Sequence, residues 1–474
     1  MRQRSLLSGA AMLLLAGCAG VPHGDPQLAR VAPASLGLAA ETPAISANWW
    51  SAFGDPQLDR LIETGLADNP SLQGALARVR VADAQLGAAR AQLDPQVTGI
   101  GTVQESHLGD HFIGEGGWST IGLVTGSLSW NLDLFGRLHA SVDRARGNAA
   151  AADLDAAGAR LMLASSIAQA YVGLAQAEQQ IRVANDFAAT RQQALGFVQT
   201  RIRDQLASQF DLRTAQTLLA EAQQSQVRAL RQRDLLVHAL AALVGRGADF
   251  YPQVTAPTLA LNAAPPVPQL LPADLLGRRP DLLAAQARID ASVANRRVAR
   301  AAFYPNIDIS AFAGIASMGL SHLVSAGSAM GGGGPAITLP IFDGGKLRAQ
   351  YRGATADLDR AIADYNDAVL AAVRDSADAI TNVRSADADL ATQEKVVAGL
   401  RDTVRLNGVR TRTGLGTQLD AIESGFRLLE AEQQLVGLQA DTLSRRIQLI
   451  TALGGGFAPA PVTTAAAPAS DKRS

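Results

Sequence analysis

Few residues of this 474-residue chain have types and spacing that could support chemistry. His107 and His111 could ligate a metal ion, but they lie in the loop 107–118 without a cluster of further ligands, so a surface loop is the simpler interpretation. The runs Gly331–Gly334 and Gly344–Gly345 lack the spacing of a phosphate-binding loop and are interpreted as a flexible loop and a turn. No Ser/His/Asp set or pair of carboxylates stands out. We therefore expect no enzyme, no resident metal and no cofactor.

The only cysteine, Cys18, follows an export signal. Residues 1–17 begin with positive charge and contain an apolar run, 6–15, that is too short to span a bilayer comfortably, so they are predicted to be a cleaved signal peptide. Residues 15–18 resemble a bacterial lipobox, in which the cysteine becomes the lipidated first residue of the mature protein. An ordinary signal peptide with an incidental cysteine is the alternative. Ala19, which is not acidic, favours sorting to the outer membrane by the same resemblance.

The composition narrows the remaining classes. The chain has 42 basic and 43 acidic residues, so a polyanionic partner such as nucleic acid is not expected. Aromatic residues make up only 4% of the chain, while Ala, Leu, Gln and Arg are frequent. This composition is typical of long helices rather than of a β-sandwich.

The chain contains two copies of one unit. Residues 69–97 reappear as 279–307, and residues 136–245 reappear as 345–454 without a gap. Arg201 and Arg410, for example, occupy the same place in the two copies. A duplication of this length indicates two copies of one structural unit.

Each copy is predicted to form two strands followed by a pair of long helices. No proline occurs between Pro95 and Pro252 or between Pro340 and Pro459. A proline inside a helix costs about 3 kcal/mol or more, so these stretches favour long helices. Apolar and small residues recur at steps of three and four from Leu154 to Ala175, as in a coiled coil. The predicted helices are 136–204, 208–245, 345–412 and 417–453, and the predicted strands are about 96–106, 119–132, 305–317 and 334–342.

The segments that flank these elements have other compositions. Residues 18–48, rich in Ala, Pro and Gly, are predicted to be a lipidated tether, and residues 246–278 a linker between the repeats. Residues 455–474 are predicted to be a disordered tail. The repeats themselves are therefore placed at 49–245 and 279–454.

The strand segments alternate weakly between apolar and polar residues. Ile307, Ile309 and Ile315 face one way and Asp308 the other, with Phe312 as an exception on the polar side. Such segments fit transmembrane strands, but soluble hairpins packed on the helices fit too. If the strands do cross a membrane, four of them cannot close a barrel, because open edges are not tolerated in hydrocarbon. Several chains must then share one barrel; two copies would supply eight strands and three would supply twelve.

Four motifs in order resemble one protein family. They are the segments 49–56 (WWSAFGDP), 131–138 (NLDLFGRL), 271–281 (LPADLLGRRPD) and 339–347 (LPIFDGGKL). Over residues 49–457 the chain resembles the TolC/NodT-type outer-membrane factor lipoproteins of tripartite efflux systems. The resemblance implies a mainly α-helical homotrimer with a 12-stranded β-barrel in the outer membrane of a Gram-negative bacterium and an α-helical barrel in the periplasm.

The same resemblance implies a function. The trimer would be a passive duct for small molecules that works with a periplasmic adaptor and an inner-membrane pump of the resistance-nodulation-division (RND) type. A duct for type I protein secretion is the nearest alternative. A periplasmic coiled-coil lipoprotein without a pore is an alternative of a different class.

The turns between the long helices are the predicted adaptor contacts. By the resemblance, Leu206 and Leu415 would be exposed apolar contacts, and Ser208, Gly416 and Thr417 would lie beside them. Ser208 and Thr417 also suit the N-caps of the returning helices, which is a structural role that would hold in any case.

A charged constriction near the same end is a further hypothesis. Many members of the resembled family have an acidic residue at the position of Gly416, and this departure puts an acidic ring in doubt. Asp402, Arg405, Arg410 and Arg412 are nearby in the sequence and could narrow the aperture instead. A solvated helix face is the alternative for each of these charges.

Overall fold

The computed structural model describes residues 24–32, 36, 45–108, 117–262, 267 and 275–457. The predicted signal peptide, Cys18, His111 and residues 458–474 of the predicted tail lie outside the described residues. The described residues divide into two compact units, and each unit takes segments from both copies of the repeat. The first unit comprises the described parts of Met1–Arg30, Ala77–Asp153 and Ala284–Asp367; the second comprises those of Val31–Leu76, Leu154–Leu283 and Ala368–Ser474.

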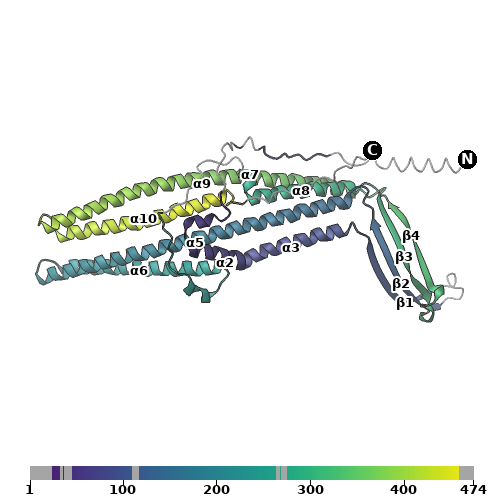
Figure 1. Ribbon diagram of the computed structural model, residues 1–474, viewed down its shortest axis with the longest axis horizontal. Helices are drawn as coiled ribbons and strands as arrows, with labels where there is room; N and C mark the ends of the chain where they lie inside the picture. The colour runs from purple at the N-terminus through teal and green to yellow at the C-terminus, as the bar shows by residue number, and fades with distance from the viewer. Residues whose placement is uncertain are drawn as a thin grey trace, which may run out of the picture. The chain divides into compact units, whose positions relative to one another are not determined.

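The first unit contains one antiparallel sheet whose four strands follow the chain order (Figure 1). β2 of the first copy pairs with β3 of the second copy, so the sheet joins the two repeats. The central pairing sets Val124 opposite Ile315 and Leu128 opposite Ala311. The strands are β1 (Gln96–Leu108), β2 (Gly117–Asn131), β3 (Asn306–Met318) and β4 (Ala329–Thr338).

The fourth strand differs from the predicted strand 334–342 and from the predicted flexible loop at Gly331–Gly334. All four glycines belong to β4 and pair with β3. Gly333 has no room for a side chain, because a Cβ there would lie 2.9 Å from the Cβ of Ala311. The strand ends before Pro340, which has no N–H to donate to a neighbouring strand. A glycine run was therefore wrongly interpreted as a flexible loop, because its pairing partner is distant in the sequence.

A helix precedes each pair of strands, and the predicted order of strand, strand and helix pair omitted it. α3 (Pro70–Ala91) and α8 (Pro280–Ala301) each have 22 residues and begin with proline. Proline suits the first turn of a helix, where its missing N–H would have no partner in any case. Each helix ends shortly before a second proline, Pro95 or Pro305.

The four long helices have the same lengths in both copies. α5 (Arg137–Arg203) and α9 (Lys346–Arg412) have 67 residues each, and α6 (Gln209–Leu243) and α10 (Gln418–Ala452) have 35 each. In the second unit α6 returns beside α5 and α10 beside α9 (Figure 1). Among the described helices, none is both long enough and apolar enough to cross a membrane.

The core of the second unit is built from both repeats. Ile167 and Tyr171 of α5 and Leu240 of α6 pack with Leu443 and Ile447 of α10. Trp49 and Phe53 of the short 3₁₀ helix η2 (Trp49–Phe53) join this cluster together with Leu58 and Ile62 of α2 (Pro56–Asp68).

Asp55 connects this N-terminal motif to the core. Its carboxylate caps α2 by accepting from the backbone N–H of Gln57 at 2.9 Å, and it also accepts from the hydroxyl of Tyr171 at 2.8 Å and from Thr258. Burial raises the pKa of Asp55, but these hydrogen bonds outweigh burial and hold the pKa below its usual value. Burial and the bond to Asp55 raise the pKa of Tyr171. The Asp-Pro pair of the motif is therefore a helix start with a buried anchor.

Two repeat-equivalent residues donate hydrogen bonds to the C-terminal ends of α6 and α10, one through an amide and the other through a guanidinium. The amide of Asn69 donates to the carbonyl of Leu243 at 2.8 Å, and the guanidinium of Arg279 donates to the carbonyl of Ala452 at 3.0 Å. Both carbonyls lie in the last turn of a helix, where no intrahelical donor remains. The turn after α10 continues to Phe457, whose N–H donates to the carbonyl of Gly454 at 3.0 Å. The predicted disordered tail is therefore wrong for its first three residues.

The predicted linker contains two short helices, the 3₁₀ helix η3 (Ala248–Gln253) and α7 (Leu275–Arg278).

Candidate functional site

The sheet has one mainly apolar face and one more polar face. Successive residues of a strand point to opposite faces, and the register aligns like with like across the sheet. Val97, Leu128 and Ala311 share one face, whereas Thr98 and Ser127 share the other. Phe312, which lies on the more polar face, contacts Gly332, where a Cβ would meet its ring at 3.1 Å. An aromatic ring therefore fills the place of a missing side chain.

Two tryptophans mark the ends of the apolar face. Trp118 and Trp130 lie on the same face of β2, near its opposite ends, and Trp118 is 74% exposed. The two tryptophans are twelve residues apart along the strand, at about 3.4 Å per residue. For a strand tilted by about 40° in a membrane barrel, they would be about 30 Å apart along the membrane normal. This spacing matches aromatic girdles at the two surfaces of a bilayer, with an apolar band between them.

The predicted histidine candidate for metal binding lies at one end of this face. The ring of His107 contacts the ring of Trp118 edge-on, with 5.6 Å between centroids. Across the described residues there is no group of three or more His, Cys, Asp or Glu side chains that could hold a metal ion.

Both outer strands of the sheet have one unpaired edge. β1 pairs only with β2, and β4 pairs only with β3, within the described part of the chain. Large apolar residues on the sheet, among them Val97, Val124 and Ile337, are exposed. Unpaired strand edges require another strand to pair with, and an exposed apolar face requires a protein partner or lipid.

The turns at the far ends of the long helices lie in the second unit and have the same hydrogen bonds in both repeats. The Ser208 hydroxyl accepts from the N–H of Asp211, whose carboxylate accepts from the N–H of Ser208 at 2.8 Å. Thr417 and Asp420 form the same capping box. The predicted N-caps of α6 and α10 are therefore present in the structure.

An arginine holds each exposed leucine in place. The guanidinium of Arg201 donates to the carbonyl of Leu206 at 2.9 Å, and that of Arg410 donates to the carbonyl of Leu415 at 3.2 Å. The leucine side chains are 64% and 73% exposed. Gly416 follows with little space beside it, since a Cβ there would lie 3.2 Å from the Cβ of Arg410. Both turns thus present an apolar side chain on a hydrogen-bonded backbone.

The four candidate aperture charges fall into different environments. Asp402 and Arg405 form an exposed ion pair on α9, with 3.3 Å between nitrogen and oxygen. Arg410 is bonded to the turn, and Arg412 is the exposed last residue of α9.

Sequence reasoning missed an apolar groove beside the first turn. The groove has a volume of about 400 Å³ and lies between α5, α6 and α10. Phe210, which is 78% exposed, and Leu206 line one end, and Arg191 and Phe426 line it as well. Phe210 and Leu419, which follow the two N-caps, are repeat-equivalent apolar residues, and this was the available signal.

Arg191 connects the two repeats above this groove. Its Cζ lies 3.4 Å from the ring centroid of Phe426 on α10 and 5.1 Å from that of Phe187 on α5. Burial lowers the pKa of Arg191 and outweighs the negative charges of Glu430 and Glu221, which raise it. Arg191 is partly buried, and cation–π contacts contribute from about 0.5–1 kcal/mol at exposed sites to about 2 kcal/mol when desolvated, whereas an exposed ion pair contributes about 0–1 kcal/mol.

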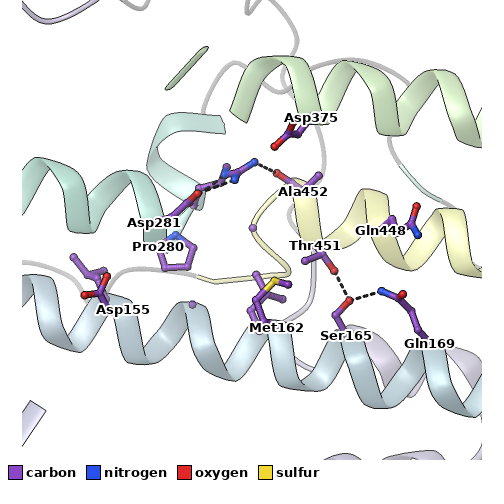
Figure 2. A pocket seen from close by; sticks show the side chains of 15 residues that line it. Asp155, Met162, Ser165, Gln169, Pro280, Asp281, Asp375, Gln448, Thr451 and Ala452 are labelled. Carbon is purple, nitrogen blue, oxygen red and sulfur yellow. Dashed lines mark hydrogen bonds and ion pairs between the residues drawn. The ribbon is translucent and has the colours of Figure 1, made fainter. Parts of the chain in front are cut away.

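A second cavity, of about 480 Å³, lies in the second unit between α5 and the end of α10. Figure 2 shows its polar side chains bonded to one another, with Thr451 and Gln169 both donating to the buried hydroxyl of Ser165, at 2.9 and 3.0 Å. Arg279 is paired with Asp281 at 2.7 Å. The polar groups of this wall stabilise a helix junction, and they include no base placed to activate the hydroxyl.

A strap, defined as residues 24–30, lies against α8 and α9 in the first unit. The carboxylate of Asp359 accepts from the backbone N–H groups of Gln27 and Leu28 at 2.8 and 3.0 Å. The strap also carries an ion pair between Arg30 and Asp290 at 3.4 Å, and its Gly24 carbonyl accepts from Arg296. Part of the predicted lipidated tether is thus held on the helices.

A sheet with an apolar face, aromatic ends and open edges, combined with duplicated long helical hairpins, defines a subunit of a membrane channel. The chain belongs to the outer membrane efflux protein family, whose family model matches residues 61–246 and 271–455. The predicted family and the mainly α-helical fold with a small β part are therefore confirmed.

Relatives agree over most of the chain. The chain is 34% identical to the fusaric acid resistance protein FusA of Burkholderia cepacia, over 73% of this chain and 68% of that protein. It is 30% identical to the probable efflux pump outer membrane protein TtgC of Pseudomonas putida, over 96% of both. The crystal structure of VceC from Vibrio cholerae has a TM-score of 0.79 and 32% identity, over 87% of this chain and 99% of that one.

These findings establish the class of function. The protein is the outer-membrane channel component of an efflux pump in a Gram-negative bacterium and extends into the periplasm. They favour efflux over the alternatives of protein secretion and of a coiled-coil lipoprotein without a pore.

Proposed function

We propose that three copies of this chain close one 12-stranded barrel and export small toxic organic compounds through it. The single observation that carries this proposal is the four-stranded sheet with two unpaired edges and an apolar face between Trp118 and Trp130. Open edges are not tolerated in hydrocarbon, so copies must pair β1 with β4. Eight strands leave an interior that side chains fill, whereas twelve leave room for a lumen. The polar face would then line the lumen.

The substrate class is proposed from the relatives' names. They include a fusaric acid resistance protein, a toluene efflux pump component and a multidrug resistance protein, all of which concern small molecules. A passive duct need not select among such compounds, so the partner pump would determine which are exported.

Lipid attachment at Cys18 is part of the proposal, and the strap supports it. Gly24 and Asp25 contact Arg296, which lies five residues, or about 8 Å along the helix, before the end of α8, and β3 begins five residues after that end. The six residues from Cys18 to Gly24 span at most about 20 Å. The lipid could therefore reach the inner surface of the membrane that holds the sheet.

The helix turns would bind the periplasmic adaptor, which connects the trimer to an RND-type inner-membrane pump. Leu206 and Leu415 expose apolar surface at the ends of the hairpins, and the groove that contains Phe210 continues it. Ser208, Gly416 and Thr417 would contribute by shaping the turns. Exposed apolar patches of this kind mark interaction surfaces.

The closed aperture would be narrowed by charges on α9. Asp402, Arg405 and Arg412 project from the exposed surface of that helix near its end, whereas Arg410 would act by holding the turn. Substitution of Asp402 or Arg405 should raise the entry of a bulky antibiotic in cells, and unchanged permeability would remove these residues from the aperture.

The test of the proposed function is the oligomer mass and conductance of the purified, lipidated protein. A trimer that conducts ions in planar bilayers is expected, and a monomer without conductance would contradict the proposal. The adaptor role is tested by Leu206→Glu with Leu415→Glu, which should abolish cross-linking to the adaptor and drug resistance. Conductance should remain, because the sheet is unchanged. An effect on conductance alone would contradict the assignment of the turns.

A further inference from the structure

We propose that Arg191 is a latch that keeps the channel closed by fastening α10 of the second repeat to α5 of the first. The inference rests on the proposed channel function and adds the residue that regulates it. The guanidinium lies 3.4 Å from the ring centroid of Phe426, close enough for direct stacking, and Phe187 adds a second ring at 5.1 Å. One side chain thus joins residues that are more than 200 positions apart in the chain.

Two equivalent glutamates reinforce the position of this arginine. Glu221 on α6 and Glu430 on α10 occupy the same place in the two repeats, and both attract the charge of Arg191. Each lies twelve residues after the first residue of its helix, and Arg191 lies twelve residues before the end of α5. Helices α5, α6 and α10 therefore meet at one level through Arg191, above the apolar groove.

The duplication shows that this contact exists at only one of two repeat-equivalent positions. The repeat equivalents of Phe187, Arg191 and Phe426 are Val396, Leu400 and Thr217. These side chains have neither a charge nor a ring, so α9 and α6 cannot form the same latch with each other. A fold built from two equal halves thus has a cation–π contact at one of its two possible positions.

α10 also contacts α9 of its own repeat near this level, where the amide of Gln393 donates to the carbonyl of Ala431 at 2.9 Å. Arg401 of α9 pairs with Glu432 of α10 at 2.9 Å, but the arginine is largely exposed and its attraction is screened by water. Because Arg191 is packed between rings beside the groove, a partner that enters the groove would reach the latch directly. Release of Arg191 would free the N-terminal end of α10 from α5 and let the helix ends separate, while the core around Leu443 and Ile447 stays packed.

The test compares single-channel recordings of the full-length lipidated trimer with those of Arg191→Leu and Phe426→Leu. Loss of the latch should raise open probability about tenfold, since a partly buried cation–π contact is removed. Arg191→Lys keeps the charge without the planar stack and should give a smaller rise. Arg401→Leu removes an arginine at the same level from an exposed ion pair, and it should behave as wild type.

The outcomes separate the latch from the channel. Arg191→Leu and Phe426→Leu trimers with normal mass and wild-type open probability would overturn the latch and leave the channel intact. Loss of assembly in all the Arg191 and Phe426 variants would assign the cluster to folding and also overturn it. Wild-type protein that neither trimerises nor conducts would overturn the proposed function itself.

Discussion

Gln205 and Gly414 occupy the same place in the two helix turns, and both have a left-handed backbone, with φ of 58° and 75°. Glycine adopts this conformation freely, whereas another residue pays about 1–2 kcal/mol for it. The first repeat thus keeps a strained turn that the second repeat relieves with glycine. The reason for the strain is the sharp reversal from α5 into the N-cap Ser208, which the second turn repeats at Thr417.

Exchange of the residues should move the stability of the turns in opposite directions. Gly414→Ala should destabilise its turn by about 1 kcal/mol, and Gln205→Gly should stabilise the other by up to about 1 kcal/mol. Amide hydrogen exchange of the two turns, followed by mass spectrometry, measures both effects. Faster exchange in Gln205→Gly than in the wild type would contradict this account.

The capping boxes should weaken in acid. The backbone N–H of Ser208, and then its hydroxyl, hold the pKa of Asp211 below its usual value, and Thr417 does the same for Asp420. A lowered folded-state pKa adds stability that is complete above the unfolded pKa of about 3.9 and is lost as the pH falls through the folded value. The turns should therefore fray below about pH 4, and pepsin should cleave near them increasingly from pH 4 to pH 2. The combined variant Asp211→Asn, Asp420→Asn should show a flatter pH profile, and an unchanged profile would refute the role of these carboxylates.

Adjacent residues of β2 should differ in their tolerance of charge. Val124 lies on the apolar face opposite Ile315, and Thr125 lies on the polar face. Val124→Arg should lower the stability of the membrane-inserted trimer by about 2–4 kcal/mol, because the charge would face lipid. Thr125→Arg should change conductance with little effect on stability. Urea unfolding in bilayers and recordings of current test the pair, and the reverse result would exchange the faces.

The strap should detach when its main acceptor is removed. Asp359→Ala leaves two backbone N–H groups without their carboxylate. Trypsin cleavage after Arg30 should then accelerate about fivefold, as expected for a loss of about 1 kcal/mol of local stability. Asp364→Ala, on the exposed surface of the same helix, is the matched control. Equal cleavage rates in the two variants would show that Asp359 does not hold the strap.

The long helices and their turns could be predicted from neighbouring residues. Stretches without proline, together with Ser208 and Thr417 as caps, determine where α6 and α10 begin, because these preferences are local. Pro70 and Pro280 are local start signals for α3 and α8, although the predicted order of strand, strand and helix pair lacks these two helices. The exposure of Leu206 and Leu415 agrees with the predicted adaptor contacts, whose role stays a prediction.

The sequence by itself determined the duplication, the long helices and the family, because these depend on local spacing and on motifs that survive in order. Only the tertiary structure decided which residues of the two copies meet. Gly331–Gly334 form part of β4 because they pair closely with β3. Arg191 joins the two repeats because Phe426 packs against it. Contacts between residues 200 positions apart depend on how whole helices and strands pack, and no local pattern encodes that packing.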